Sequence, residues 1–190
     1  MDAEALGTER LGARLRELRE RSGLSLRAVA RELGISPSAV SQIERGLMRP
    51  SVSRLIAYVT AIGVPLAEVF DPADVQPVAF AVRRAGEVAP ILLSGGITFR
   101  RLSPSATPDV EFFESTYPPL SISNAHGQFL KHDGYEVGTV TAGELTVEFE
   151  SETVTLGPGD SVTFPCDRPH LIGNRSDKVT AVATWLIVHR

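Results

Sequence analysis

The chain has 190 residues, which is enough for two small domains. Its only cysteine, Cys166, excludes an intrachain disulfide, and the absence of any run of about 18 apolar residues argues against a membrane span. No apolar segment follows a basic start, so we expect a cytoplasmic protein without a signal peptide. The net charge of −4 argues at first sight against a nucleic-acid partner.

The charge is divided unevenly along the chain. Residues 1–55 contain 10 arginines and 7 acidic residues, which gives a net charge of +3. Residues 56–190 contain 9 basic and 16 acidic residues, which gives −7. Positive charge gathered in one segment is the electrostatic signature of phosphate binding, so the first 55 residues become the candidate DNA-binding part.

Two helices are predicted first. Leu11, Leu15 and Leu18 recur at the spacing of one helical face within an Arg- and Glu-rich segment. Ser25 is a good N-cap for a second helix, and Gly34 ends it. The link that follows is so short that the next helix must cross the second one at a steep angle.

Residues 36–46 read Ser-Pro-Ser-Ala-Val-Ser-Gln-Ile-Glu-Arg-Gly, which is typical of the DNA-reading helix of a helix-turn-helix. Ser36 is an N-cap and Pro37 occupies the first helical position, where its missing N–H costs nothing. Val40 and Ile43 fall on one face and pack inward. The outward face carries hydroxyl, amide and guanidinium groups, which bond to base edges and phosphates. These residues are Ser38, Ser41, Gln42 and Arg45.

Two more helices complete the predicted bundle. Ser51, behind Pro50, is a cap for a fourth helix with its apolar face running to Val59. Residues 65–70 predict a short fifth helix. We therefore expect an all-α, five-helix domain over residues 8–72.

The 36–46 run and the register of its neighbouring helices resemble the phage-repressor-like helix-turn-helix family, also called the xenobiotic-response-element family. The resemblance implies that a homodimer reads a palindromic operator in double-stranded DNA, with half-sites about 34 Å apart. We expect base contacts from Ser38 and Gln42, with Ser41 beside them on the same face. Phosphate contacts are expected from Arg27, Ser36, Arg45 and Arg49. The alternative is a helical bundle whose arginines merely solvate its surface.

Helical periodicity ends after Phe70, and the composition becomes that of a β domain. Residues 73–77 predict a linker, and residues 78–190 predict an all-β domain, so the fold class is α+β in two domains. The strand-like runs are separated by Gly, Pro, Asp and Asn, which suggests an antiparallel sandwich or barrel. They are residues 78–82, 97–102, 144–149, 153–156, 161–164 and 179–188.

Two motifs make this β domain more specific. Residues 132–136 read His-Asp-Gly-Tyr-Glu, and residues 159–165 read Gly-Asp-Ser-Val-Thr-Phe-Pro, with His170 and Asn174 beyond them. Together they resemble the two motifs of the cupin family, a jelly-roll barrel. The resemblance implies a metal or effector pocket lined by His132, Glu136 and His170.

The pocket chemistry leaves an alternative open. Two histidines and one carboxylate suit Fe(II) and related divalent ions, so Fe, Mn, Ni and Zn are candidate cofactors. Leu130 stands where the first histidine of the family motif would fall. The same residues could therefore line a metal-free pocket for a small effector.

Three functions follow from this pattern. The leading one is a DNA-binding transcription regulator whose cupin binds a small-molecule effector and forms the dimer through its strand edges. The second is a metal-dependent cupin enzyme with a vestigial helix-turn-helix, of which hydroxypropylphosphonate epoxidase is an example. The third is a DNA-binding dimer without an effector.

Overall fold

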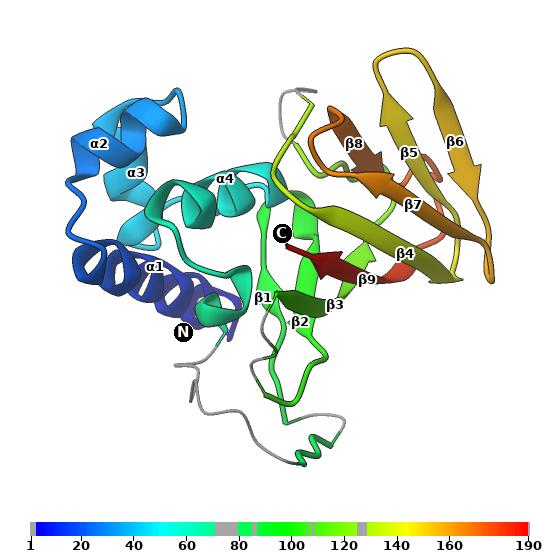
Figure 1. The fold of residues 1–190 in the computed structure, drawn as a ribbon, viewed down its shortest axis with the longest axis horizontal. Coiled ribbons are helices and arrows are strands. Elements are labelled where there is room, and N and C mark those ends of the chain that lie inside the picture. Colours follow the sequence, from blue (N-terminus) through cyan, green and yellow to red (C-terminus); the bar gives the residue numbers. More distant parts are fainter. Residues whose placement is uncertain are drawn as a thin grey trace.

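The computed structural model describes six stretches of the chain, in which helices lie on one side and strands on the other (Figure 1). The described residues are 3–70, 80–84, 87–105, 107, 109–124 and 129–189. The predicted linker at 73–77 lies outside them. No helix among these residues is long and apolar enough to cross a bilayer.

Four α-helices lie in the described part of the N-terminal half. They are α1 (Ala3–Arg21), α2 (Leu26–Glu32), α3 (Pro37–Glu44) and α4 (Val52–Ile62). Ser25, Ser36 and Ser51 cap the last three, each accepting from the amide three residues later at 3.1 to 3.3 Å. These caps confirm the predicted helix starts, since a hydroxyl satisfies one of the orphan amides of a first turn.

The predicted fifth helix is wrong. Residues Leu66–Val69 form a single 3-10 turn, η1, instead of an α-helix. Its backbone bonds run from Glu68 to Pro65 and from Phe70 to Ala67, three residues apart. A segment of four residues is too short to recover the cost of nucleating an α-helix, so it closes into the tighter turn.

The C-terminal half is a β domain of two antiparallel sheets. Its described strands are β1 (Ile91–Leu92), β2 (Thr98–Arg101), β3 (Val110–Tyr117), β4 (Tyr135–Ala142), β5 (Leu145–Phe149), β6 (Thr153–Leu156), β7 (Ser161–Pro165), β8 (His170–Gly173) and β9 (Ala181–Val188). One sheet has the order β1-β2-β3-β9-β4-β7, and the other has the order β6-β5-β8. The large sheet pairs strands far apart in sequence, as a jelly roll does.

The strand predictions were right where apolar residues alternate and incomplete elsewhere. The run at 78–82 is not confirmed, because its described residues 80–82 lie outside any strand. Strands β1, β3, β4 and β8 were missed. In β3 the inward positions include Glu111 and Ser115, both buried, so the polar residues hide the period-two pattern.

The two halves are docked against each other by main-chain bonds. The Ser53 amide donates to the Ser123 carbonyl at 3.1 Å, and the Ser94 amide donates to the Pro50 carbonyl at 3.0 Å. Near η1, the Ala67 amide donates to Glu111 Oε1 at 2.7 Å. The helix that follows α3 is therefore fixed to the β domain through its own backbone.

Candidate functional site

The predicted DNA-reading residues lie on the surface of α2 and α3. Arg27, Ser38, Gln42 and Arg45 are exposed, and Ser41 is half-buried. Since α3 carries Ser38, Ser41 and Gln42 on one short helix, the structure brings these side chains onto a single surface. That surface offers donors and acceptors at the spacing of a helix, which is what direct readout in a major groove requires.

Ser36 and Arg49 have partners of their own within the protein. The Ser36 hydroxyl accepts from the Ala39 amide as the N-cap, and the residue remains exposed. Arg49 is half-buried, and its Nε donates to Thr8 Oγ1 at 2.9 Å. The bond from Arg49 joins the segment after α3 to α1, so this guanidinium is held in place before any phosphate arrives.

A buried ionic cluster anchors α3 from behind. Arg19 donates to both carboxylate oxygens of Glu44, at 2.7 and 2.9 Å. The Tyr58 hydroxyl donates to the same carboxylate at 2.6 Å. Hydrogen bonding to Glu44 raises the pKa of Arg19, so the guanidinium stays charged. Glu44 comes from the Ile-Glu-Arg-Gly end of the motif, and the sequence analysis assigned it no role.

The close approach of α1 to α3 explains two glycines. A Cβ on Gly12 would lie 2.5 Å from the carbonyl oxygen of Ile43, so only glycine fits there. Gly46 has φ +69°, and a Cβ on it would lie 2.7 Å from the backbone of Glu9. Both glycines allow the first helix to pack tightly against the end of the reading helix.

In the β domain the structure brings His132, Glu136 and His170 together. His132 Nε2 lies 3.1 Å from Glu136 Oε1, and His170 Nε2 lies 4.0 Å from the same oxygen. Gly134, at φ +103°, turns the chain so that His132 folds back over Glu136. His170 arrives from β8, so two segments far apart in the chain supply the three residues.

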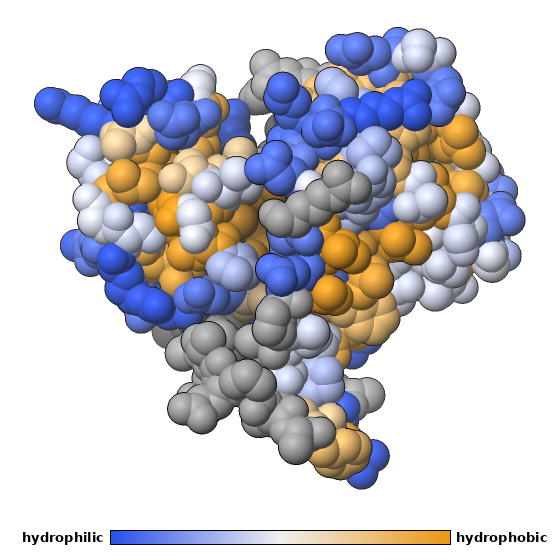
Figure 2. Space-filling model, viewed as in Figure 1, coloured by the Kyte–Doolittle hydropathy of each residue, from blue (hydrophilic) through white to orange (hydrophobic). Residues whose placement is uncertain are grey.

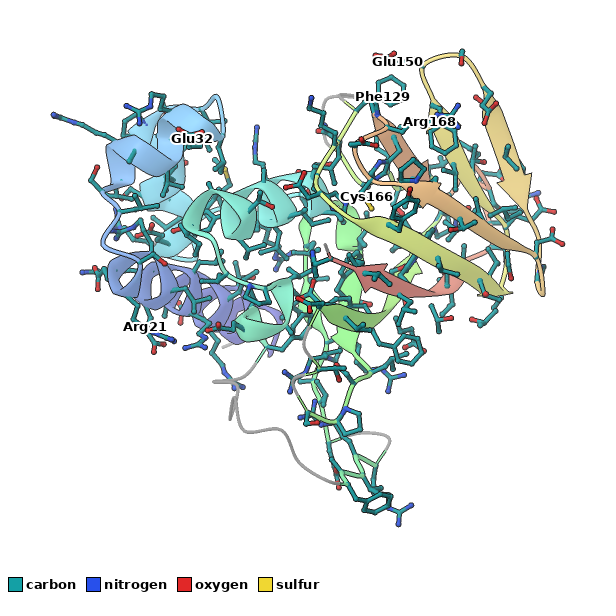
Figure 3. All side chains as sticks on the ribbon, in the orientation of Figure 1. Arg21, Glu32, Phe129, Glu150, Cys166 and Arg168 are labelled. Atoms are coloured by element: carbon teal, nitrogen blue, oxygen red, sulfur yellow. The ribbon has the colours of Figure 1, made fainter. Side chains whose placement is uncertain are left out.

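Cys166 is a further member of this cluster that the sequence motifs did not indicate. Its sulfur and ligand atoms of His132 and Glu136 all lie within 4.8 Å of one another. Burial raises the pKa of its thiol, and the Glu136 carboxylate adds to the rise, so the free group is protonated. Figure 3 shows Cys166 where the chain leaves β7, on the side of the β domain that faces the helices.

The hydrogen bonds of the two histidines suit metal ligands. His170 Nδ1 faces the Arg168 carbonyl at 2.9 Å, so it carries the proton and leaves Nε2 with a lone pair toward Glu136. Burial lowers the pKa of His170, which favours this neutral form. Both nitrogens of His132 face acceptors, the Asp133 carbonyl and the Glu136 carboxylate. Such a ring is satisfied either as an imidazolium or with a cation beside Nε2.

Leu130 lies beside this cluster as an apolar neighbour. Its backbone pairs with that of His170, with both hydrogen bonds at 2.9 Å. The place of the family's first histidine is thus apolar, while a thiol is added on another side. The structure brings one imidazole, one carboxylate and one thiol within 4.8 Å of one another, with the second imidazole beside the carboxylate, and these donor types fit a divalent transition ion of borderline softness.

The space inside the β barrel is small. A cavity of about 30 Å³ lies next to Glu136 and His170 and is walled by Phe113, Tyr117 and Trp185. Its roof includes Val52 and Ile56 of α4. A volume of this size holds a water molecule or a metal ion and excludes an organic molecule.

Comparisons with known families agree with this geometry. The profile of a family described as a helix-turn-helix domain matches residues 10–70, and that of a family described as a cupin domain matches residues 122–187. The chain is a helix-turn-helix protein with a C-terminal cupin domain. The two family resemblances predicted from the sequence motifs are thereby confirmed.

Relatives of this helix-turn-helix cupin protein span both of its domains. The HTH-type transcriptional regulator PuuR of Escherichia coli (strain K12) is 29% identical over 168 residues, covering 87% of this chain and 88% of the relative. SutR, another HTH-type transcriptional regulator of that strain, is 26% identical over 173 residues, covering 88% and 89%. The crystal structure of an HTH_3 family transcriptional regulator from Vibrio cholerae covers 99% of both chains with a TM-score of 0.72 and 21% identity, which shows a shared fold.

Proposed function

We propose that this protein is a sequence-specific DNA-binding transcription regulator. The observation that carries the proposal is the outward face of α3, where Ser38, Ser41 and Gln42 lie on a helix anchored by the buried Glu44. A helix held rigidly from behind and polar in front can enter a major groove without first becoming ordered. The named regulators among its relatives support this function.

Each polar residue then has a role on the operator. Ser38 and Gln42 contact base edges, with Ser41 beside them. Arg27, Ser36, Arg45 and Arg49 contact phosphates, which set the register of the helix on the duplex. Because its guanidinium is already bonded to Thr8, Arg49 loses little conformational freedom on binding.

Operator titrations with single variants test these roles. Gln42→Ala should lower affinity for the selected operator and relax its sequence preference. Arg49→Ala should weaken binding to all sequences alike and reduce the slope of log affinity against log salt by about 1. Arg175→Ala, on the exposed surface of the cupin, is the matched control. If Arg49→Ala changed only sequence preference, its assigned role would be wrong.

The proposal includes a homodimer, because one small reading domain covers only a half-site. Apolar residues gather on the outer face of the β3-β9-β4 sheet, where Phe112, Leu186 and Val137 face one another across three paired strands. Phe112 is 38% exposed and Val137 is 41% exposed. Figure 2 shows apolar surface over this part of the sheet. We assign the dimer contact to this face, in place of the strand edges that the sequence analysis favoured.

Light scattering with the matched pair Val137→Lys and Val154→Lys tests this contact. Both valines are exposed to a similar extent, but Val154 lies on β6 in the other sheet. Val137→Lys should give a monomer with weakened operator binding, while Val154→Lys stays dimeric. A dimer in both variants would place the contact elsewhere, including at the strand edges.

The cupin pocket is proposed to hold one divalent metal ion on His132, Glu136, His170 and Cys166. A bound ion would stabilise the thiolate of Cys166 and would be held by the Glu136 carboxylate and the lone pairs of neutral imidazoles. The thiol favours Zn, Fe or Ni over Mn. Elemental analysis of protein purified without chelator should find about one ion per chain, lost in His132→Ala. If the protein stays metal-free after anaerobic reconstitution, the proposed metal site is wrong.

An enzyme is the second candidate, and the two histidines with one carboxylate favour it. The small barrel cavity argues against it, because about 30 Å³ leaves no room for an organic substrate beside a metal ion. Iron-dependent consumption of oxygen by the purified protein would support the enzyme. Its absence in iron-loaded protein that still binds its operator supports the regulator.

A further inference from the structure

We propose that the effector site of this protein is the cleft between its two domains, and that its ligand is a small organic cation with an apolar body. This proposal deepens the regulator function and rests on it. The cleft lies between α4 and η1 on one side and the ends of β3 and β9 on the other. The family resemblance pointed instead to the barrel interior.

The cleft and the barrel interior differ in volume. The cleft encloses about 530 Å³, within the range of small-molecule sites, whereas the barrel cavity encloses about 30 Å³. Ile56 and Ile187 line both spaces and stand between them. An organic effector therefore fits the cleft and does not fit the barrel without a large rearrangement of α4.

The walls of the cleft define the class of ligand. Buried apolar side chains, among them Ile56, Val59 and Leu66, form one side. Among the described lining residues there are carboxylates and no lysine or arginine. Asp109 and Asp133 are exposed carboxylates at its rim, while Glu111 lies buried within it. A cation attached to a hydrocarbon body matches both features, because the four carboxylates that line the cleft outnumber its two histidines, His132 and His189.

The position of the cleft allows a bound ligand to affect the helix-turn-helix domain. Glu111 accepts from the Ala67 amide of η1 through one oxygen and bonds to His189 at 2.9 Å through the other. A ligand seated there contacts α4 and η1 together with the cupin sheet. It binds the docked arrangement of the two domains more tightly than an undocked one, and that difference in affinity is the coupling to DNA.

Calorimetric titration of the full-length protein with n-hexylammonium, n-hexanoate and n-hexanol tests the ligand class without any DNA. We expect n-hexylammonium to bind and n-hexanoate not to bind, with n-hexanol weaker than the cation. Asp109→Asn should weaken binding of the cation roughly threefold to fivefold, the range that exposed charge pairs support. Asparagine tolerates the φ of +59° at this position, so the fold is preserved.

Two further variants test whether the cation binds in the cleft. Thr60→Trp adds bulk at an exposed position on the α4 wall and should abolish binding of n-hexylammonium. Glu150→Gln removes one negative charge from the loop between β5 and β6, which lies far from α4 and η1 (Figure 3), and should leave binding unchanged. Unchanged binding in Thr60→Trp, equal binding of the anion, or no binding of any probe would overturn the proposal.

A measurement of operator binding distinguishes failure of the cleft proposal from failure of the proposed regulator function. If the wild-type protein binds its operator but the probes fail as described, the cleft proposal alone is wrong. If the cation binds in the cleft but no DNA sequence is preferred, the regulator function is wrong. With both correct, n-hexylammonium shifts operator affinity in the wild type and not in Thr60→Trp.

Discussion

Two buried clusters of polar side chains lie in this molecule, one behind the reading helix and one in the cupin pocket, and their hydrogen bonds differ. Around Glu44, the guanidinium of Arg19 and the hydroxyl of Tyr58 both donate to a single carboxylate. Around Glu136, His132 Nε2 lies 3.1 Å from a carboxylate oxygen, the lone pair of His170 Nε2 faces the same oxygen at 4.0 Å, and a thiol lies beside them. In the first cluster each donor meets an acceptor, whereas in the second the lone pair of His170 lies beside a carboxylate that already contacts His132.

This difference separates a structural cluster from a binding site. A matched buried ion pair holds its neighbours in one geometry and has no remaining capacity for a ligand. A cluster rich in acceptors is completed only by a proton or a cation. The same chain therefore uses buried charge to make one helix rigid and to prepare a pocket.

Replacing the central glutamate of each cluster by glutamine should change the free energy of unfolding most in the cluster behind α3. Glu44→Gln should lower the free energy of unfolding by about 3 kcal/mol, because it leaves the buried Arg19 guanidinium with only the exposed Glu20 carboxylate, 3.5 Å away, as a counter-charge. Urea denaturation followed by circular dichroism measures this loss. A cost below about 1 kcal/mol would show that the pair is dispensable to the fold, as many exposed pairs are.

Metal binding gives the next largest effect and concerns only the cupin cluster. Zinc at a free concentration about a hundredfold above its dissociation constant should raise the free energy of unfolding by about 2.7 kcal/mol. Cys166→Ser should remove most of that gain, since the thiolate is the soft ligand. An equal gain in Cys166→Ser would show that the thiol does not bind the ion.

Glu136→Gln in metal-free protein is the counterpart of Glu44→Gln and should change stability by less than about 1 kcal/mol, within the range of a single neutral hydrogen bond. The amide keeps the volume of the carboxylate and can donate to the lone pair of His170. The same urea titration applies. A loss as large as that for Glu44→Gln would mean that the metal-free cupin cluster is as structural as the first.

The smallest expected effect is a pH dependence at the domain junction. Hydrogen bonding to Glu111 raises the pKa of His189 above its ordinary value of 6.5, and Asp109 and Asp133 add to the rise. The stabilisation is therefore complete below about pH 6.5 and is lost as the pH rises through the raised pKa. It stays below about 1 kcal/mol because His189 is 37% exposed and solvent screens the pair.

Thermal denaturation of the wild type and His189→Gln across this pH range measures the effect. The difference between the two proteins should be greatest on the acid side and vanish on the alkaline side. A difference that grows with pH would reverse the assigned direction of the pKa shift.

The helical domain was predictable from sequence because its signals are local. A serine cap, a proline at the first helical position and a glycine at the end are each read within one turn of helix, and the structure confirms them at Ser36, Pro37 and Gly46. The partners of Glu44 were not predictable, since Arg19 and Tyr58 lie 25 and 14 residues away. Only the packing of α1 against α3 and α4 brings them together.

The cupin pocket was predictable in part because its motifs are also local. The turn at Gly134 folds His132 back onto Glu136. That pairing could be anticipated from the sequence, because Asp133-Gly134 is a dipeptide that readily forms a turn. Cys166 could not be placed, because its distance to Glu136 depends on the pairing of β4 with β7. The small size of the cavity beside Glu136 depends on α4, whose Val52 and Ile56 line it, and no motif within a single domain contains that packing.

The most direct test of the central claim is selection of bound sequences from a random DNA library by the purified full-length protein. Our account predicts enrichment of a palindromic site with half-sites one helical turn apart, and Gln42→Ala should enrich an altered or relaxed sequence at specific base positions. A library that returns no common site, with the same weak retention for wild type and Gln42→Ala, would contradict the claim that α3 reads DNA.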